Sequence, residues 1–156
     1  MTASIFIDAD ACPVKEEVYR VARRYEIKVR VVANSFIRTP QDPLIERVVV
    51  DSGFDAADDW IVERAGPADI VITSDIPLAS RCLKAGAQVI APSGKPFTDS
   101  SIGMALAMRD LMTDLRAMGE RSGPPPFSAR QRSAFLSALD EAVTRMLRNP
   151  PREAGR

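Results

Sequence analysis

Five short apolar runs dominate the pattern of hydrophobic and polar positions along the chain. They are rich in Ile and Val and hardly alternate with polar residues, which is typical of strands whose two faces are both covered. Helical patterns separate them, so the order of elements predicts parallel strands joined by helical crossovers. The predicted strands cover residues 4–7, 28–33, 47–50, 69–73 and 88–91. The predicted fold class is α/β, with three layers (α/β/α) around a central, mainly parallel five-stranded sheet.

Apolar positions that recur at a spacing of 3.6 residues predict helices between and after these strands. The first helix begins at Pro13, whose fixed φ suits an opening turn. Gly66 and Pro67 end the second, and Gly86 follows the third. A last helix follows a Ser128 cap. The predicted helices cover residues 13–25, 55–65, 76–85, 101–118 and the stretch from 129 to about 148.

Glycines and prolines between residues 119 and 126 predict a stiff connector before the last helix. That helix carries an amphipathic stripe, which must be buried either on the same domain or against a second copy of the chain. We therefore expect an α/β domain at 1–120, a connector and helix at 121–148 packed on it, and a disordered tail at 149–156. Alternatively, the apolar stripe of the last helix is buried in a homodimer.

The composition narrows the chemistry more than it narrows the fold. The 156 residues include 21 Lys and Arg, 21 Asp and Glu, and no His. Catalytic triads or dyads that need an imidazole, and zinc sites held by histidine, are therefore excluded. Cys12 and Cys82 are expected to be buried thiols in a reducing compartment. With no long apolar span and no basic leader, the sequence predicts a cytoplasmic protein without a membrane partner.

The neutral total charge conceals an asymmetry along the chain. Residues 1–115 carry a net charge of −4 and residues 116–156 a net charge of +4. The basic end is either an ordinary solvated surface or a flap that helps to hold an anionic polymer, since Arg pairs with phosphate through two parallel hydrogen bonds. Four basic side chains are candidate phosphate contacts: Arg38, Lys95, Arg109 and Arg116.

Carboxylates follow two of the predicted strands directly. Asp8 and Asp10 come after the first strand, and Asp75 comes after the fourth. In an open parallel sheet the ligand crevice lies outside the carboxyl ends of the strands, where the strand order reverses. If the first and fourth strands are neighbours, these acids converge. Asn34 ends the second strand, where it could either line the same crevice or serve only in a turn.

The second predicted helix adds Asp55, Asp58 and Asp59, which the spacing places on one helical face. Carboxylates grouped in this way repel one another unless a cation neutralises them, and a site made only of oxygen ligands selects Mg²⁺ or Mn²⁺. Such an ion can activate water and bind a phosphodiester. The sequence therefore predicts a metal site among Asp8, Asp10, Asp55, Asp58, Asp59 and Asp75.

Several longer motifs stand out along the chain: residues 8–13 (DADACP), 32–34 (VAN), 53–58 (GFDAAD), 69–79 (DIVITSDIPLA), 123–127 (GPPPF) and 132–135. Together they resemble the YaiI/YqxD family of bacterial proteins. The resemblance covers about residues 4–139. The family is grouped with PIN-like domains, whose better-known members are metal-dependent ribonucleases with an acidic cluster at the end of a central parallel sheet.

The resemblance implies roles for individual residues. Asp8 matches the acid after the first strand of PIN-like nucleases. Thr73, Ser74 and Asp75 match their hydroxyl-containing turn, in which the hydroxyl supports the site and the Asp approaches the metal. Asp55 and Asp59 resemble the acids of the middle helix, and Asp58 competes for the second place. The catalytic set that follows is Asp8, Asp55, Asp59 and Asp75, with Mg²⁺ or Mn²⁺ as cofactor and RNA or single-stranded nucleic acid as substrate.

Two alternatives remain at this point. The Asp8-Ala9-Asp10 sequence after an apolar strand also fits a haloacid-dehalogenase-like phosphatase with Asp8 as nucleophile, although Asp58 and Asp59 precede the fourth strand and that family's metal-binding pair follows it. The other alternative is a module that binds nucleic acid or a protein without turnover, because folds are reused for different functions.

Overall fold

A computed structural model describes residues 3–51, 55–104, 107 and 127–148 of the chain. Five strands form one parallel sheet: β1 (Ser4–Asp8), β2 (Lys28–Ala33), β3 (Ile45–Val49), β4 (Asp69–Ile72) and β5 (Gln88–Ile90). Their order is β3-β2-β1-β4-β5. The central strand β1 therefore pairs with both β2 and β4, and the strand order reverses between β1 and β4.

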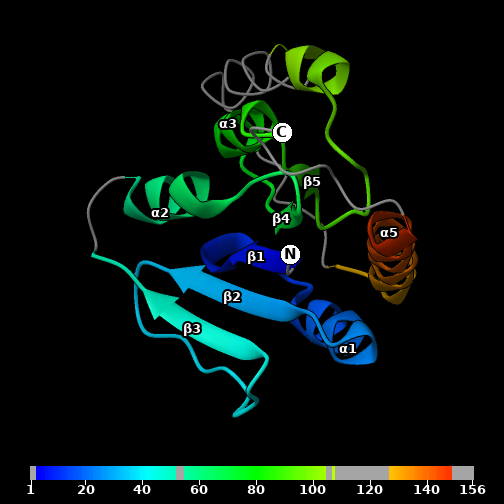
Figure 1. The fold of residues 1–156 in the computed structure, drawn as a ribbon. Helices are drawn as coiled ribbons and strands as arrows, with labels where there is room; N and C mark the ends of the chain where they lie inside the picture. The colour runs from blue at the N-terminus through cyan, green and yellow to red at the C-terminus, as the bar shows by residue number, and fades with distance from the viewer. Residues whose placement is uncertain (1–2, 52–54, 105–106, 108–126, 149–156) are drawn as a thin grey trace.

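Helices cover both faces of this sheet (Figure 1). Helices α1 (Lys15–Tyr25) and α5 (Ala129–Arg148) pack on the face that carries Ile5 and Ile7. Helices α2 (Ala56–Arg64) and α3 (Ile76–Lys84) pack on the face that carries Phe6 and Val71. Successive strand residues point to opposite faces, so each strand contributes to two separate cores. The predicted three-layer α/β/α class is confirmed.

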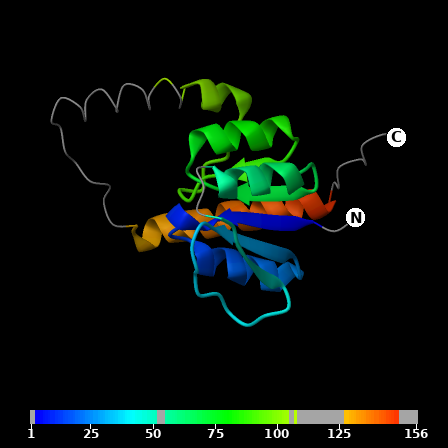
Figure 2. The same cartoon turned by 90° about the vertical axis from the view of Figure 1, so that its left-hand side faces the viewer.

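The C-terminal helix α5 lies beside α1, as Figure 2 also shows. Phe135, Leu139 and Val143 of its apolar stripe are fully buried in the same core as the α1 residues. The helix begins with reciprocal hydrogen bonds between Ser128 and Gln131, the first from Gln131 N–H to Ser128 Oγ at 3.1 Å and the second from Ser128 N–H to Gln131 Oε1 at 2.8 Å. This is a capping box, which confirms the predicted Ser128 cap.

Three predicted boundaries are wrong by two residues. Strand β3 begins at Ile45 rather than at residue 47, because Ile45 pairs with Val29 and is buried. Helix α1 begins at Lys15, after residues 9–11 form a 3₁₀ turn, η1 (Ala9–Ala11). The fourth helix begins at residue 99, since reciprocal hydrogen bonds between Thr98 and Ser101 cap it. Most of its predicted length, like the predicted connector and tail, lies outside the described residues.

Candidate functional site

The carboxyl ends of β1 and β4 lie side by side, which brings Asp8 close to Thr73. Asp8 is the last residue of β1, and Thr73 follows the end of β4. The register pairs Ile7 with Ile72, so the next residue of each chain segment reaches the same edge of the sheet. The sequence predicts that the acids after these two strands converge if the strands are neighbours. The strands are neighbours, and they end where ligands bind to open α/β sheets.

Thr73 connects two of the predicted metal ligands. Its buried hydroxyl donates a hydrogen bond to Asp8 Oδ2 at 2.9 Å and accepts one from the N–H of Asp75, also at 2.9 Å. Asp75 caps α3, and its Oδ1 accepts a hydrogen bond from the N–H of Leu78 at 3.0 Å. Because both carboxylates have a hydrogen-bond partner that fixes them, Asp8 and Asp75 keep defined positions at this edge. Ser74, between Thr73 and Asp75 in the sequence, is exposed.

Asp10 and Asn34 extend the site toward β2. Asp10 lies in η1, and its Oδ2 accepts a hydrogen bond from the backbone N–H of Asn34 at 3.2 Å. Asn34 directly follows β2, and its exposed side chain lies at the same edge of the sheet. The backbone of Asn34 supplies this contact, and a role of its side chain in the crevice stays a prediction.

Helix α2 contributes Asp58 to this group of acids. Burial and the charges of Asp75, Asp8 and Asp55 raise the pKa of Asp58 to about 6. Burial, followed by the charges of Asp75 and Asp10, also raises the pKa of Asp8, although the hydrogen bond from Thr73 opposes the shift. In both shifts burial has the largest effect, and the charges of neighbouring carboxylates add to it. We call Asp8, Asp10, Asp55, Asp58 and Asp75 the acidic cluster.

The three acids of the second helix do not share one orientation. Asp59 forms an ion pair with Arg81 of α3, with Oδ1 and Nη2 2.9 Å apart, and its side chain is exposed. Asp55 is the residue before α2, in a left-handed conformation with φ of 64°, and its side chain makes no capping hydrogen bond. Asp55 thus departs from the regular helical spacing on which the predicted acidic face depended, while its charge still acts on Asp58. Asp55 and Asp58 belong to the acidic cluster, whereas Asp59 pairs with Arg81.

Arg81 is the residue that the sequence analysis missed. The sequence shows it beside the apolar positions of the third helix, with no motif that marks it. Only the packing of α2 against α3 places it next to Asp59, and it also lowers the pKa of Asp58, against the larger effects of burial and the neighbouring acids. The structure describes only two of the four candidate phosphate contacts. Arg38 and Lys95 are exposed, and Arg109 and Arg116 lie outside the described residues.

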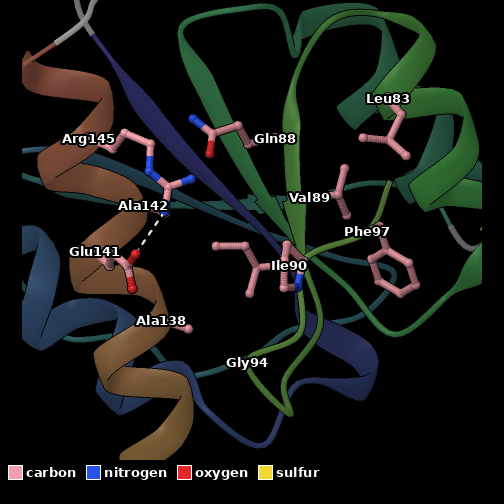
Figure 3. A pocket seen from close by; sticks show the side chains of 11 residues that line it. Leu83, Gln88, Val89, Ile90, Gly94, Phe97, Ala138, Glu141, Ala142 and Arg145 are labelled. Atoms are coloured by element: carbon pink, nitrogen blue, oxygen red, sulfur yellow. Dashed lines mark hydrogen bonds and ion pairs between the residues drawn. The ribbon is translucent and has the colours of Figure 1, made fainter. Parts of the chain in front are cut away.

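Other features of the described residues lie apart from the acidic cluster. A pocket of about 350 Å³ opens between β5, the turn after it and α5 (Figure 3). Apolar side chains such as Ile90 and Phe97 line it, together with Arg145, which pairs with Glu141. Cys12 and Cys82 are buried free thiols, as predicted. Burial raises the pKa of both, that of Cys82 to about 12, so neither thiol is an activated nucleophile.

Two findings concern the described ranges alone. No three Asp, Glu or Cys side chains in them come close enough together to share one metal ion. No helix in them combines the length and the hydropathy that crossing a membrane requires.

The protein is of the three-layer α/β/α class, with a parallel sheet between two layers of helices and an acidic cluster at the carboxyl ends of its central strands. The chain belongs to the family described as "Uncharacterized BCR, YaiI/YqxD family", whose profile matches residues 6–145. The resemblance found in the sequence motifs is therefore confirmed.

Curated relatives agree with this assignment over almost the whole chain. A UPF0178 protein of Bradyrhizobium diazoefficiens is 66% identical over 92% of this chain and 87% of its own length. A UPF0178 protein of Nitrobacter winogradskyi is 66% identical over 95% of this chain and 96% of its own. One from Rhodopseudomonas palustris strain TIE-1 is 67% identical over 92% of each chain. The names of these relatives state no activity.

Proposed function

We propose that this protein is a metal-dependent nuclease of the PIN-like type, which hydrolyses phosphodiester bonds in RNA or single-stranded nucleic acid. The observation that supports the proposal is the acidic cluster at the strand-order reversal. Asp8 and Asp75 are held there by one threonine, and Asp58 reaches the same space from α2.

The chemical type of the donor atoms in the acidic cluster fits Mg²⁺ or Mn²⁺. All its candidate ligands are carboxylate oxygens. Burial is the main cause of the raised pKa values of Asp8 and Asp58, and the neighbouring carboxylates add a negative charge that a cation would neutralise. Mg²⁺ usually keeps several waters and binds through one or two carboxylates together with substrate phosphates. Asp8 and Asp75 therefore suffice as its protein ligands, with Asp10, Asp55 and Asp58 adding negative charge.

The residues of the chain prepare the site for this chemistry. A bound Mg²⁺ or Mn²⁺ would supply an activated water and neutralise charge on the phosphodiester. Thr73 keeps Asp8 oriented through its hydroxyl, and the Leu78 N–H keeps Asp75 oriented at the start of α3. Asp58, with a pKa of about 6, is mostly ionised at neutral pH and can take up a proton near that pH. Asp59 is less suited to a direct role because Arg81 holds it.

The test is the substitution Asp8→Asn, which preserves the shape of the side chain and its ability to accept the hydrogen bond from Thr73. We expect it to abolish cleavage of single-stranded RNA in the presence of Mg²⁺ or Mn²⁺, because it removes a charged ligand. Cleavage of a fluorescent oligonucleotide measures the effect, and circular dichroism checks that the variant is folded.

The control for this test is Glu63→Gln, which neutralises an exposed acid of α2 outside the acidic cluster and should leave cleavage unchanged. Cleavage that persists in purified Asp8→Asn would refute the proposal. RNA binding without cleavage in the wild-type protein would favour a non-catalytic module. Hydrolysis of small phosphate esters through a phosphorylated Asp8 would favour the phosphatase.

A further inference from the structure

Phe36 is an exposed aromatic side chain that an arginine holds in place. It lies in the segment between β2 and β3, and 72% of its surface is exposed. The guanidinium carbon of Arg47 lies 4.4 Å from the centroid of its ring. Arg47 Nη1 also donates a hydrogen bond to the carbonyl of Ile37 at 3.4 Å. Arginine stacked on one face of a ring steadies it and leaves the opposite face available for a ligand.

The chain places this ring at the border of the acidic cluster. The backbone N–H of Asn34 donates to Asp10, and Phe36 is only two residues further along. Two residues span at most about 7 Å, so Phe36 lies within a short distance of that contact. A polymer chain that crosses Asp8 and Asp10 toward β2 would meet the ring next.

The surface around Arg47 is not covered by the helical layer of the described residues. Ile45, Arg47 and Val49 point to the same face of β3, since side chains alternate along a strand. Ile45 is buried in the core that contains α1, whereas Arg47 is exposed and Val49 is 48% exposed. The covering layer therefore ends before Arg47, and the face beyond it is open to a partner.

The charges beside the ring favour a polyanion as that partner. Arg47 lies over one face of the ring, and Arg38, which is exposed, follows Phe36 by two residues, so a second cation is close along the chain. An aromatic ring with one open face and arginines nearby suits a nucleobase whose flanking phosphates need cations. Charged residues on the edge strand, such as Glu46 and Arg47, disfavour the addition of a strand from a second protein.

We propose that Phe36, supported by Arg47, is a stacking platform for one base of a single-stranded nucleic acid, and that Arg38 contacts an adjoining phosphate. The inference rests on the proposed function for its class of ligand. It adds the subsite that would hold the strand next to the acidic cluster, and it explains why an aromatic side chain is exposed at this position.

Fluorescence anisotropy with a labelled oligouridine and the full chain tests the platform, in EDTA so that binding is measured without cleavage. Phe36→Ala should weaken binding about tenfold, as expected for the loss of one base stack. Phe36→Trp should bind at least as tightly as the wild type, because it keeps a stacking surface. Leu147→Ala is the matched control, since it truncates another apolar side chain, 50% exposed, near the end of α5. It should have no effect.

An oligonucleotide with the same phosphates but no bases separates stacking from other effects. On that strand, wild type and Phe36→Ala should bind equally. The inference is overturned if Phe36→Ala binds oligouridine as tightly as the wild type does, if it loses the same affinity for the abasic strand, or if the wild type binds neither. It is also overturned if the substitution dissociates a dimer in sedimentation without changing RNA affinity.

Cleavage assays with Mg²⁺ or Mn²⁺ distinguish this inference from the nuclease proposal. Binding that depends on Phe36 in a protein that never cleaves supports the platform and removes only the proposed nuclease activity. Cleavage and binding that are both unaffected by Phe36→Ala remove only the platform.

Discussion

Thr73 shows how one small side chain can organise a group of acids. It is 1% exposed, and its hydroxyl uses both its donor and its acceptor capacity on the two segments that end at the acidic cluster. A hydrogen bond to an ionised carboxylate is stronger than one between neutral groups. The bond to Asp8 therefore offsets part of the cost of keeping that carboxylate charged while it is partly buried.

The raised pKa of Asp58 predicts how the stability of the protein depends on pH, which can be measured without a substrate. That pKa is raised from 3.8 to about 6 in the folded protein. The folded state therefore binds more protons than the unfolded state in this interval, and the contribution of Asp58 to stability falls as pH rises from about 4 to 6. In EDTA, Asp58→Asn should raise the melting temperature at pH 8 and leave it unchanged at pH 4.

The expected gain for Asp58→Asn is about 1 kcal/mol, or roughly 3 °C, because solvent screens much of the repulsion at a partly exposed site. Thermal unfolding followed by circular dichroism measures it. Asp59→Asn is the matched control on the adjacent residue. It removes an ion pair with Arg81 and should not stabilise the protein at any pH. Equal gains from the two substitutions would contradict the assignment of Asp58 to the acidic cluster.

At the scale of elements, α5 supports the sheet by packing beside α1 on the same face. Tyr25 of α1 donates a hydrogen bond from its hydroxyl to Asp140 Oδ1 at 2.9 Å, and Arg24 pairs with the same carboxylate. Between the helices, Phe135 and Leu139 are fully buried. The apolar stripe of α5 is thus largely used within the chain, and a homodimer through this helix stays a prediction.

Phe135→Ala tests how much of the stability depends on this contact. We expect a loss of about 3–5 kcal/mol, since truncation of a buried Phe removes apolar contact and leaves a cavity. The melting temperature should fall by roughly 10 °C. Urea unfolding measures the change, and Ser133→Ala, at an exposed position of the same helix, should have little effect. A loss below about 1 kcal/mol would show that α5 is not firmly docked.

At the scale of the whole molecule, a total charge of zero gives divalent ions no net charge to neutralise, so a large stabilising effect would indicate binding at a site. A ligand that binds only the folded state stabilises it, by about 2.7 kcal/mol when its concentration is a hundred times its dissociation constant. Saturating Mn²⁺ should therefore raise the melting temperature of the wild type by roughly 5–10 °C.

The same titration should have no effect on Asp8→Asn, whereas Glu63→Gln should respond like the wild type. Differential scanning fluorimetry measures all three proteins, and an equal concentration of charge as NaCl controls for screening. A shift of the same size in Asp8→Asn would place the ion outside the acidic cluster.

The architecture was predictable because the strands of a covered sheet have a distinctive composition. β1, β4 and β5 each contain a run of consecutive apolar residues, β2 is interrupted only by Arg30, and the bounds of all four agree with the prediction to within one residue. β3 is an edge strand with Glu46 and Arg47 in its middle, so its apolar signal is interrupted and its start was misplaced. The pairing of β1 with β4 could be stated only as a condition, because no local pattern encodes strand order.

The candidate site was predictable in its chain segments but not in every residue. Asp8, Thr73 and Asp75 follow from their positions at strand ends. The choice between Asp58 and Asp59 could not be made, because adjacent helical residues differ by about 100° around the axis. Their orientation depends on Arg81, which approaches from another helix. Phe36 carried no motif either, since a lone aromatic in a connecting segment has no distinctive pattern.

The position of β1 between two distant partners governs the order in which the chain can fold. Ser4 pairs with Lys28 on one side and with Asp69 on the other. During synthesis from the N-terminus, β1, β2 and β3 can pair while β4 is still missing, and the free edge of β1 then remains exposed to aggregation. The Asp8–Thr73 hydrogen bond spans 65 residues, so the acids meet only after the second half of the sheet has been added. A ribosome-bound fragment that ends before β4 would thus contain half a sheet and no assembled acidic cluster.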